Sequence, residues 1–184
     1  IGGSGLYDIS GLQEIEHRDI SGPWGKPSDS LLCGVLGGVQ LVFLPRHGRG
    51  HTLGPSSINY RANIDALKRV GATDILSISA VGSFREEMAP GHFVICDQFI
   101  DRTFSREKSF FGPGLMAHVS LAHPVNPRLG DWCEEACHEQ QIPVHRGGTY
   151  LAMEGPQFST LAESNLYRQW GCDVIGMTNM PEAK

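Results

Sequence analysis

Apolar residues in the first quarter of the chain fall into short runs separated by glycines. Residues 31–36 and 39–44 are two such runs, and Gly37 and Gly38 lie between them. Two short apolar runs joined by a Gly-Gly dipeptide are typical of a β-hairpin. The pattern therefore predicts a hairpin whose second strand ends just before Arg46.

A helix and then a strand are predicted after this hairpin. Ser56 or Ser57 can cap a helix that runs to about Val70, where Gly71 would end it. One face of that helix would carry the apolar residues Ile58, Ala62, Leu67 and Val70. Residues 75–81 are apolar and rich in β-branched side chains, as in a strand that is buried on both faces.

The same order of helix, glycine and strand recurs near the end of the chain. Residues 161–170 form a helical pattern, Gly171 follows, and residues 172–177 read as a strand. Two such units predict an α/β sheet with helical cover. A chain of 184 residues without an evident linker fits one domain, residues 1–184, with a sizeable core.

Three segments between these units complete the prediction. Residues 92–97 read as a strand, residues 102–114 as an exposed loop, and residues 126–140 as a helix. The inward face of that helix would carry Leu129, Trp132, Cys133 and Ala136.

Composition and charge narrow the range of partners. A content of 40% hydrophobic and 19% charged residues is ordinary for a soluble globular protein. A net charge of -5 argues against a nucleic-acid partner, because binding to phosphate backbones needs a basic surface. No apolar stretch is long enough to span a bilayer and no signal sequence opens the chain, so we expect a cytoplasmic protein that does not bind membranes.

The strongest pointer to chemistry is a cationic, glycine-rich segment at residues 44–52. Arg46 can bind a phosphate with two parallel hydrogen bonds, and His47 can donate a further hydrogen bond. Gly48 and Gly50 would let the backbone approach a ligand closely. A solvated basic turn remains the alternative. We expect no metal here, because a zinc-binding His-x-x-x-His pair needs a helix and two glycines oppose one.

Three other segments could contribute to the same pocket. Residues 2–5, 79–83 and 177–178 are hydroxyl or glycine clusters beside predicted strands, where an open α/β sheet usually binds its ligand. Each could equally be a simple turn. The glycines of residues 2–5 do not have the spacing of a dinucleotide fingerprint.

Six motifs taken together carry a family resemblance. In chain order they are Ile1-Gly2-Gly3-Ser4-Gly5-Leu6, Arg46-His47-Gly48-Arg49-Gly50-His51, Asn59-Tyr60-Arg61-Ala62-Asn63, Ala80-Val81-Gly82-Ser83, Met153-Glu154-Gly155-Pro156-Gln157-Phe158 and Gly176-Met177-Thr178. This set resembles the trimeric purine nucleoside phosphorylase family, and within it the methylthioadenosine branch. The resemblance implies a homotrimeric pentosyltransferase and an α/β fold with a phosphorylase-like central mixed β-sheet flanked by helices.

The resemblance also implies roles for particular residues. The phosphate-binding set would be Ser4, Arg46, His47, Ser79, Ala80 and Thr178. Met177 would lie against the ribose, Phe158 beside the nucleoside, and His118 in the 5' pocket of a neighbouring subunit. Inorganic phosphate would be a co-substrate, with no metal and no cofactor. In the family, an aspartate protonates the leaving base, and here it is expected beyond residue 184, in a C-terminal portion that the sequence does not contain.

The implied reaction is phosphorolysis of S-methyl-5'-thioadenosine to adenine and S-methyl-5-thio-α-D-ribose 1-phosphate, a step of methionine and purine salvage. Two alternatives stay open. The substrate could be methylthioinosine or another 6-oxopurine nucleoside, because the base-binding loop is not in the sequence. The 184 residues could also be a truncated, inactive nucleoside- or phosphate-binding module.

Overall fold

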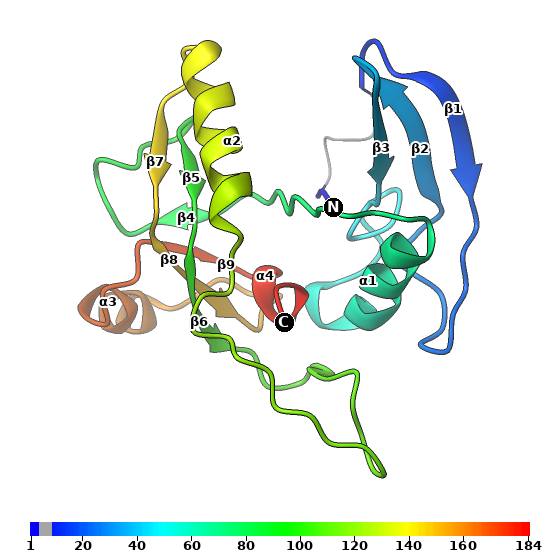
Figure 1. The fold of residues 1–184 in the computed structure, drawn as a ribbon. Helices are drawn as coiled ribbons and strands as arrows, with labels where there is room; N and C mark the ends of the chain where they lie inside the picture. The colour runs from blue at the N-terminus through cyan, green and yellow to red at the C-terminus, as the bar shows by residue number, and fades with distance from the viewer. Residues whose placement is uncertain (4–8) are drawn as a thin grey trace. The chain divides into compact units, whose positions relative to one another are not determined.

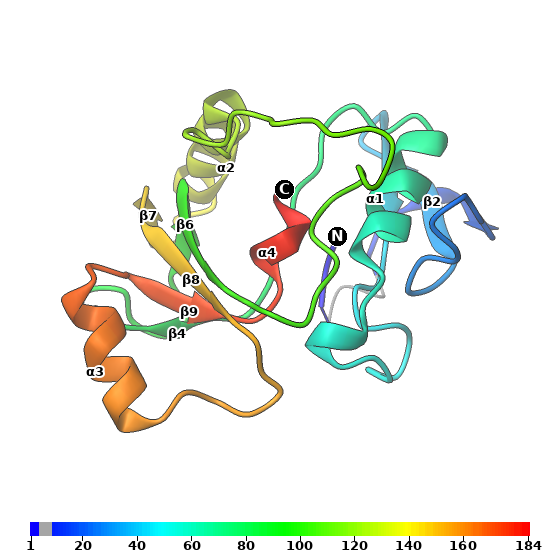
Figure 2. The ribbon, with the colours of Figure 1, turned by 90° about the horizontal axis from the view of Figure 1, so that it is seen from below.

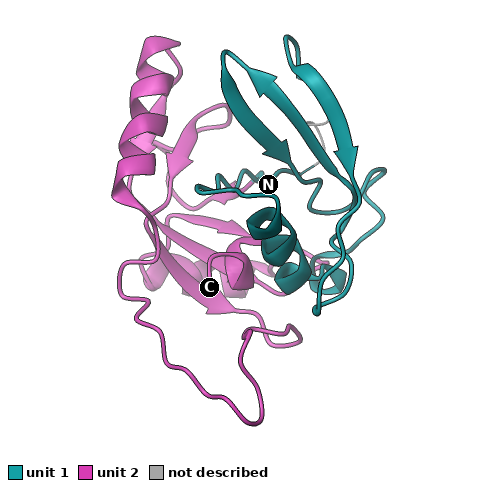
Figure 3. Cartoon of the chain, turned by 45° about the vertical axis from the view of Figure 1, so that its right-hand side comes forward, with its two compact units in different colours: residues 1–80 teal, residues 81–184 magenta. Residues whose placement is uncertain are grey.

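The computed structural model describes residues 1–3 and 9–184. The chain divides into two compact units, residues 1–80 and residues 81–184 (Figure 3). Ser4, which the family resemblance assigns to phosphate, lies outside the described residues. Each unit has its own sheet and its own buried apolar cluster.

Unit 1 contains an antiparallel sheet and a helix (Figure 1). Its elements are β1 (Gln13–Arg18), β2 (Leu31–Leu36), β3 (Val39–Phe43), the 3₁₀ turn η1 (Pro55–Ser57) and α1 (Tyr60–Arg69). The strands pair in the order β1-β2-β3. Gly37 and Gly38 join β2 to β3 with φ of 57° and 82°, a left-handed conformation that glycine adopts without strain. The predicted hairpin is confirmed.

Helix α1 packs its apolar face against this sheet. Ala66 and Leu67 of the helix share one buried cluster with Leu31 and Leu44. The predicted helix is confirmed, but its predicted cap is wrong. The side chain of Asn59, and not that of Ser56 or Ser57, accepts a hydrogen bond from the first turn, because the two serines lie in η1 instead.

Residues 75–81 do not form the buried strand that their composition predicts. Within the described residues, this segment pairs through an isolated bridge between Ile78 and Gly2. Leu76 and Ile78 remain 49% and 44% exposed. A strand is buried on both faces only where neighbouring strands and covering helices meet it, and an apolar run alone does not supply them.

Unit 2 is built on a mixed four-stranded sheet with the order β4-β9-β8-β6 (Figure 2). Its strands are β4 (Gly82–Ser83), β6 (Gln98–Arg102), β8 (Thr149–Met153) and β9 (Val174–Gly176), and a separate parallel pair joins β5 (Phe93–Ile95) to β7 (Val144–Arg146). Strands β6, β8 and β9 are parallel, whereas β4 runs antiparallel to β9. These features confirm the predicted α/β class with a mixed sheet.

Alternate residues of β8 face two different helices. Leu151 and Met153 pack with Tyr167 of α3 (Leu161–Gln169), while Tyr150 and Ala152 pack with Met180 of α4 (Asn179–Glu182). This two-residue period is that of a strand buried on both faces. The predicted helix-glycine-strand unit at residues 161–177 is therefore confirmed.

Helix α2 (Pro127–Glu139) forms where predicted, but part of its predicted inward face is wrong. Trp132 is 54% exposed, and the guanidinium of Arg128 lies 4.7 Å from its ring. The buried position is Gly130, where the guanidinium of Arg146 from β7 occupies the space of a side chain. Leu129 and Cys133 of the predicted face are half-buried, whereas Trp132 and Ala136 are exposed. A charged side chain packed against glycine gives no apolar signal, so the hydrophobic pattern could not indicate Gly130 as the buried position.

The segment predicted as an exposed loop at residues 102–114 has no regular structure after β6 ends, but it is not exposed throughout. Thr103 and Arg106 are only 5% and 9% exposed. No helix within the described residues is long and apolar enough to cross a membrane.

Candidate functional site

The cationic segment of unit 1 follows directly from β3 and lies beside the first residues of the chain. The N–H of Gly2 donates to the carbonyl of Leu44 at 3.1 Å, and the N–H of Arg46 donates to the carbonyl of Gly2 at 2.9 Å. Gly2 also forms bridges to Pro45 and to Ile78. Two of the segments that the sequence singled out, residues 2–5 through Gly2 and residues 44–52, therefore meet within unit 1, and Ile78, which precedes the segment 79–83, pairs with Gly2.

Arg46 is completely buried, and its side chain turns toward the segment that carries Ser79 and Ala80. Nη2 donates to the hydroxyl of Ser77 at 2.9 Å, and Nη1 donates to the carbonyl of Ile78 at 3.1 Å. Ser79 is half-buried and Ala80 is exposed. The structure thus places the guanidinium against the residue that precedes Ser79 in the chain.

His47 is 8% exposed and is fixed in one orientation. Its Nδ1 lies 2.8 Å from the carbonyl oxygen of Leu53, so in the neutral ring Nδ1 carries the proton and donates it. The ring stacks on that of His51, with the centroids 4.1 Å apart. Among the described residues, no group of three or more His, Cys, Asp or Glu side chains could hold a metal ion.

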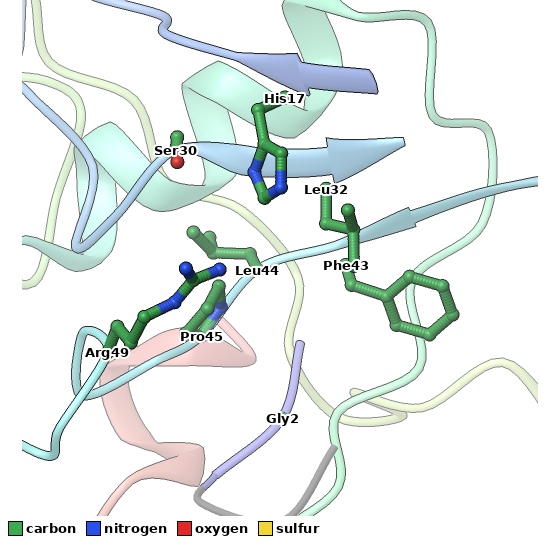
Figure 4. Close-up of a pocket in the computed structure, with 8 residues that line it drawn as sticks. All are labelled: Gly2, His17, Ser30, Leu32, Phe43, Leu44, Pro45 and Arg49. Carbon is green, nitrogen blue, oxygen red and sulfur yellow. The ribbon is translucent and has the colours of Figure 1, made fainter. Parts of the chain in front are cut away.

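A small cavity lies on another side of this segment (Figure 4). Its volume is about 20 Å³, and it is lined by Gly2, His17, Ser30, Leu32, Phe43, Leu44, Pro45 and Arg49. That volume suits about one water molecule and is far too small for a nucleoside. Arg46 does not line it, so this cavity is not the predicted phosphate pocket.

Thr178 of unit 2 lies between the end of β9 and the start of α4, and it is 5% exposed. Its backbone N–H donates to the hydroxyl of Tyr150 at 3.3 Å. Gly176 makes this contact possible, because a Cβ there would clash with the Tyr150 hydroxyl. A buried tyrosine thereby fixes the backbone of the predicted phosphate-binding threonine.

Met177, predicted to lie against the ribose, is half-buried and packs on the turn that follows β8. A Cβ at Gly155 would come within 2.6 Å of the Met177 sulfur, and Gly155 also has a φ of 69°. The left-handed φ favours glycine at this position. The missing Cβ leaves room for the thioether of Met177 against the Glu154-Gly155 turn.

Sequence reasoning missed Arg106, which is the central residue of this part of unit 2. Its guanidinium donates to the carbonyls of Met177 and Met180, and to those of Met153 and Glu154. Glu154 supplies the opposite charge, with Oε1 at 3.7 Å from Nε of Arg106. The only sequence signal was a charged residue in a loop, which ordinarily indicates a solvated side chain.

A second ionic cluster fixes the same loop nearer to β6. The carboxylate of Asp101 accepts hydrogen bonds from Lys108 at 3.0 Å and from Lys184 at 2.7 Å. Burial alone would raise the pKa of Asp101, but the hydrogen bonds from Lys184, Thr103 and Lys108 outweigh it and hold the pKa well below its usual range. Asp101 is therefore ionised at neutral pH.

Phe158 and His118 are exposed, and Phe158 has 84% of its surface accessible. Phe158 lies between β8 and α3, and His118 lies in the long connection between β6 and α2. The structure thus places part of the predicted set in unit 1 and the rest in unit 2, and it describes each unit by itself.

Comparison with known families decides which fold this arrangement belongs to. All of residues 1–184 match the family described as the phosphorylase superfamily. The chain belongs to the phosphorylase superfamily. The resemblance drawn from the sequence motifs is confirmed at this level, and so is the phosphorylase-type fold.

Two relatives of this phosphorylase-superfamily chain share one name. The chain is 68% identical over 184 residues to S-methyl-5'-thioadenosine phosphorylase of Rhodospirillum rubrum and 66% identical to the protein of the same name from Cereibacter sphaeroides. In both comparisons the whole chain is covered, and it spans 63% of the length of the relative.

Solved structures of the superfamily superpose closely on the chain. A methylthioadenosine phosphorylase from an antarctic soil metagenomic library matches with a TM-score of 0.96 and 50% identity, over 99% of this chain and 64% of that one. Methylthioadenosine phosphorylase from Schistosoma mansoni in complex with tubercidin matches with a TM-score of 0.93 and 37% identity, over 99% and 71% of the two chains.

Proposed function

We propose that the full-length protein catalyses phosphorolysis of S-methyl-5'-thioadenosine to adenine and S-methyl-5-thio-α-D-ribose 1-phosphate. The observation that carries the proposal is the 68% identity, over the whole chain, to a relative named for this reaction. The buried Arg46 and His47 support it, because a phosphorylase needs a cationic site that is shielded from water.

The proposed chemistry gives each group a physical role. Cleavage of the bond between purine and ribose builds positive charge on the sugar. A phosphate held beneath the anomeric carbon stabilises that charge and then forms the new bond to carbon. Arg46, His47, Ser79, Ala80 and Thr178 would hold the phosphate, together with Ser4.

The nucleoside half of the proposed site involves fewer residues of this sequence. Met177 would lie against the ribose and Phe158 beside the nucleoside. The leaving purine must gain a proton or a strong hydrogen bond. We assign that role to an aspartate beyond residue 184, as the family resemblance implies. The reaction itself would use no metal and no cofactor.

We also propose that the protein acts as a cytoplasmic homotrimer in methionine and purine salvage. The connection between β6 and α2 supports the trimer, because Phe104, Leu115 and Met116 are 80%, 67% and 73% exposed, and a neighbouring subunit would cover them. His118 of the same connection would reach the neighbour's 5' pocket. Light scattering of the full-length protein tests the trimer, and a monomeric mass would contradict it.

The experiment that tests the reaction is a substrate panel on the full-length protein. Methylthioadenosine, methylthioinosine, adenosine and inosine are each supplied with and without phosphate, and free base is measured. We expect adenine from methylthioadenosine only when phosphate is present. If hypoxanthine from methylthioinosine is the main product, the protein is instead a phosphorylase for 6-oxopurine nucleosides. Release of no base would favour a binding module.

A further inference from the structure

Arg106 is buried within a segment whose neighbours are exposed. Its side chain is 1% exposed, whereas Phe104, two residues earlier, is 80% exposed. Nη1 donates to the carbonyl of Met177 and, at 2.7 Å, to the carbonyl of Met180. These two carbonyls lie on either side of Thr178. One guanidinium nitrogen therefore bonds the backbone both before and after the residue proposed to bind phosphate.

The other terminal nitrogen binds the end of the neighbouring strand. Nη2 donates to the carbonyl of Glu154 at 2.7 Å and to that of Met153 at 3.4 Å. Strands β8 and β9 are parallel neighbours. Met153 and Glu154 lie at the end of β8, and residues 177–180 follow the end of β9. Because the guanidinium is planar and rigid, it fixes the spacing of the two segments in a way that a lysine ammonium does not.

Glu154 holds the guanidinium in place. Its Oε1 lies 3.7 Å from Nε of Arg106, and its Oε2 accepts the N–H of Phe104 at 2.6 Å and that of Ser105 at 3.3 Å. A buried guanidinium needs an opposite charge close by, and this carboxylate provides it. The same carboxylate also binds the backbone that leads into Arg106.

Met177 is thus constrained at both its backbone and its side chain. Arg106 binds its carbonyl, and its thioether packs against the Glu154-Gly155 turn, in the space where a Cβ of residue 155 would lie. We propose that Arg106, held by Glu154, is a positioning residue that sets Met177 and Thr178 in the geometry needed to bind ribose and phosphate. This inference rests on the function proposed for Met177 and Thr178.

The expected effect is on catalysis through geometry. Misplacing a substrate-binding group by about 1 Å can cost about 100-fold in rate, even when the altered residue lies away from the reacting atoms. Arg106 is not assigned a contact with either substrate, so its replacement acts through the backbone of residues 177–180.

The first test compares Arg106→Lys with Arg85→Lys in the full-length protein. Arg85 is the matched control, because its Nε donates at 2.7 Å to the side chain of Asp173 in the same unit. We expect R106K to lower kcat/KM for phosphate by about 10- to 100-fold, at temperatures where it is fully folded. R85K should stay within about twofold of the wild type, since its ion pair is partly exposed.

A second variant and a second measurement cover the case in which R106K does not fold. Glu154→Gln keeps an acceptor for the N–H of Phe104 but removes the charge, so it should lower kcat/KM for phosphate in the same direction and by less. With ¹³C-methyl methionine labelling, the Met177 signal, assigned by Met177→Leu, should shift in R106K or E154Q and stay in place in R85K.

The labelling measurement needs no turnover, which separates this inference from the proposed function. If wild-type protein releases no base but the Met177 signal shifts in E154Q, the proposed function fails and the positioning contact stands. Unchanged kinetics and an unchanged Met177 signal in folded R106K and E154Q would overturn the inference. Activity that falls only in proportion to unfolding, with the Met177 signal in place, would also overturn it.

Discussion

Arg46 of unit 1 and Arg106 of unit 2 are both almost completely buried, but different groups surround them. Arg46 donates to the Ser77 hydroxyl and the Ile78 carbonyl, in the segment just before Ser79. Arg106 donates to four carbonyls from two strand ends and lies beside the carboxylate of Glu154. Burial alone therefore does not distinguish an arginine proposed to bind substrate from one that fixes the backbone around it.

The largest expected effect concerns stability at the Arg106 cluster. Glu154→Ala leaves a buried guanidinium without its carboxylate, which should lower the free energy of unfolding by about 3–5 kcal/mol. Urea denaturation at neutral pH measures it. Arg85→Gln breaks a partly exposed pair in the same unit and should cost about 0–1 kcal/mol. An equal loss of unfolding free energy in the two variants would contradict the difference expected between the buried Arg106–Glu154 pair and the partly exposed Arg85–Asp173 pair.

Replacement of Arg46 should act mainly on catalysis. Arg46→Ala should cost about 2–5 kcal/mol of phosphate-dependent transition-state stabilisation, because it removes a charged contact from a desolvated site. The measurement is kcat/KM for phosphate in the full-length protein. Arg49→Ala is the control, since Arg49 lies in the same segment and is exposed. An unchanged phosphate dependence in R46A would exclude Arg46 from the site.

His118 is an exposed residue of the connection between β6 and α2, the same connection that contains Arg106. His118→Ala should lower kcat/KM for methylthioadenosine about tenfold more than for adenosine, a discrimination typical of a small apolar pocket. The ratio of the two kcat/KM values is the readout. Equal losses for the two nucleosides would place His118 outside the 5' pocket.

The smallest effect is expected at Asp101, which binds the same connection through Lys108. Because folding lowers the pKa of this carboxyl, its contribution to stability is fully present above the pKa of the unfolded chain, about 4, and is lost as the pH falls through the lower folded value. The stability difference between wild type and Asp101→Asn should therefore shrink below about pH 4. A difference that is constant from pH 7 to pH 2.5 in urea denaturation would contradict this assignment.

The two arginines also show what the sequence could predict. Arg46 follows a predicted strand and lies among glycines and histidines, and these local features predict an anion site without knowledge of the fold, which stays a prediction. The hairpin at Gly37 and Gly38 and the helix ended by Gly71 were predictable for the same reason, since their signals lie within a few residues of one another.

Arg106 could not be found in this way. Its acceptors lie 47 to 74 residues further along the chain. They are backbone carbonyls, which every residue has, so no residue type in the sequence indicates them. The inward face of α2 was mispredicted for a similar reason, because Arg146 reaches Gly130 from another element. Residues 75–81 carry the composition of a buried strand, but pairing partners and not composition determine whether a strand forms.

The proposed reaction consumes inorganic phosphate. ³¹P NMR of the full-length protein with methylthioadenosine and inorganic phosphate tests this directly, with adenine measured in the same samples. We predict that inorganic phosphate disappears in a one-to-one ratio with adenine release and that one sugar 1-phosphate signal replaces it. Adenine release with the phosphate signal unchanged would mean that water is the nucleophile, and it would contradict the phosphate-binding role of Arg46 and Thr178.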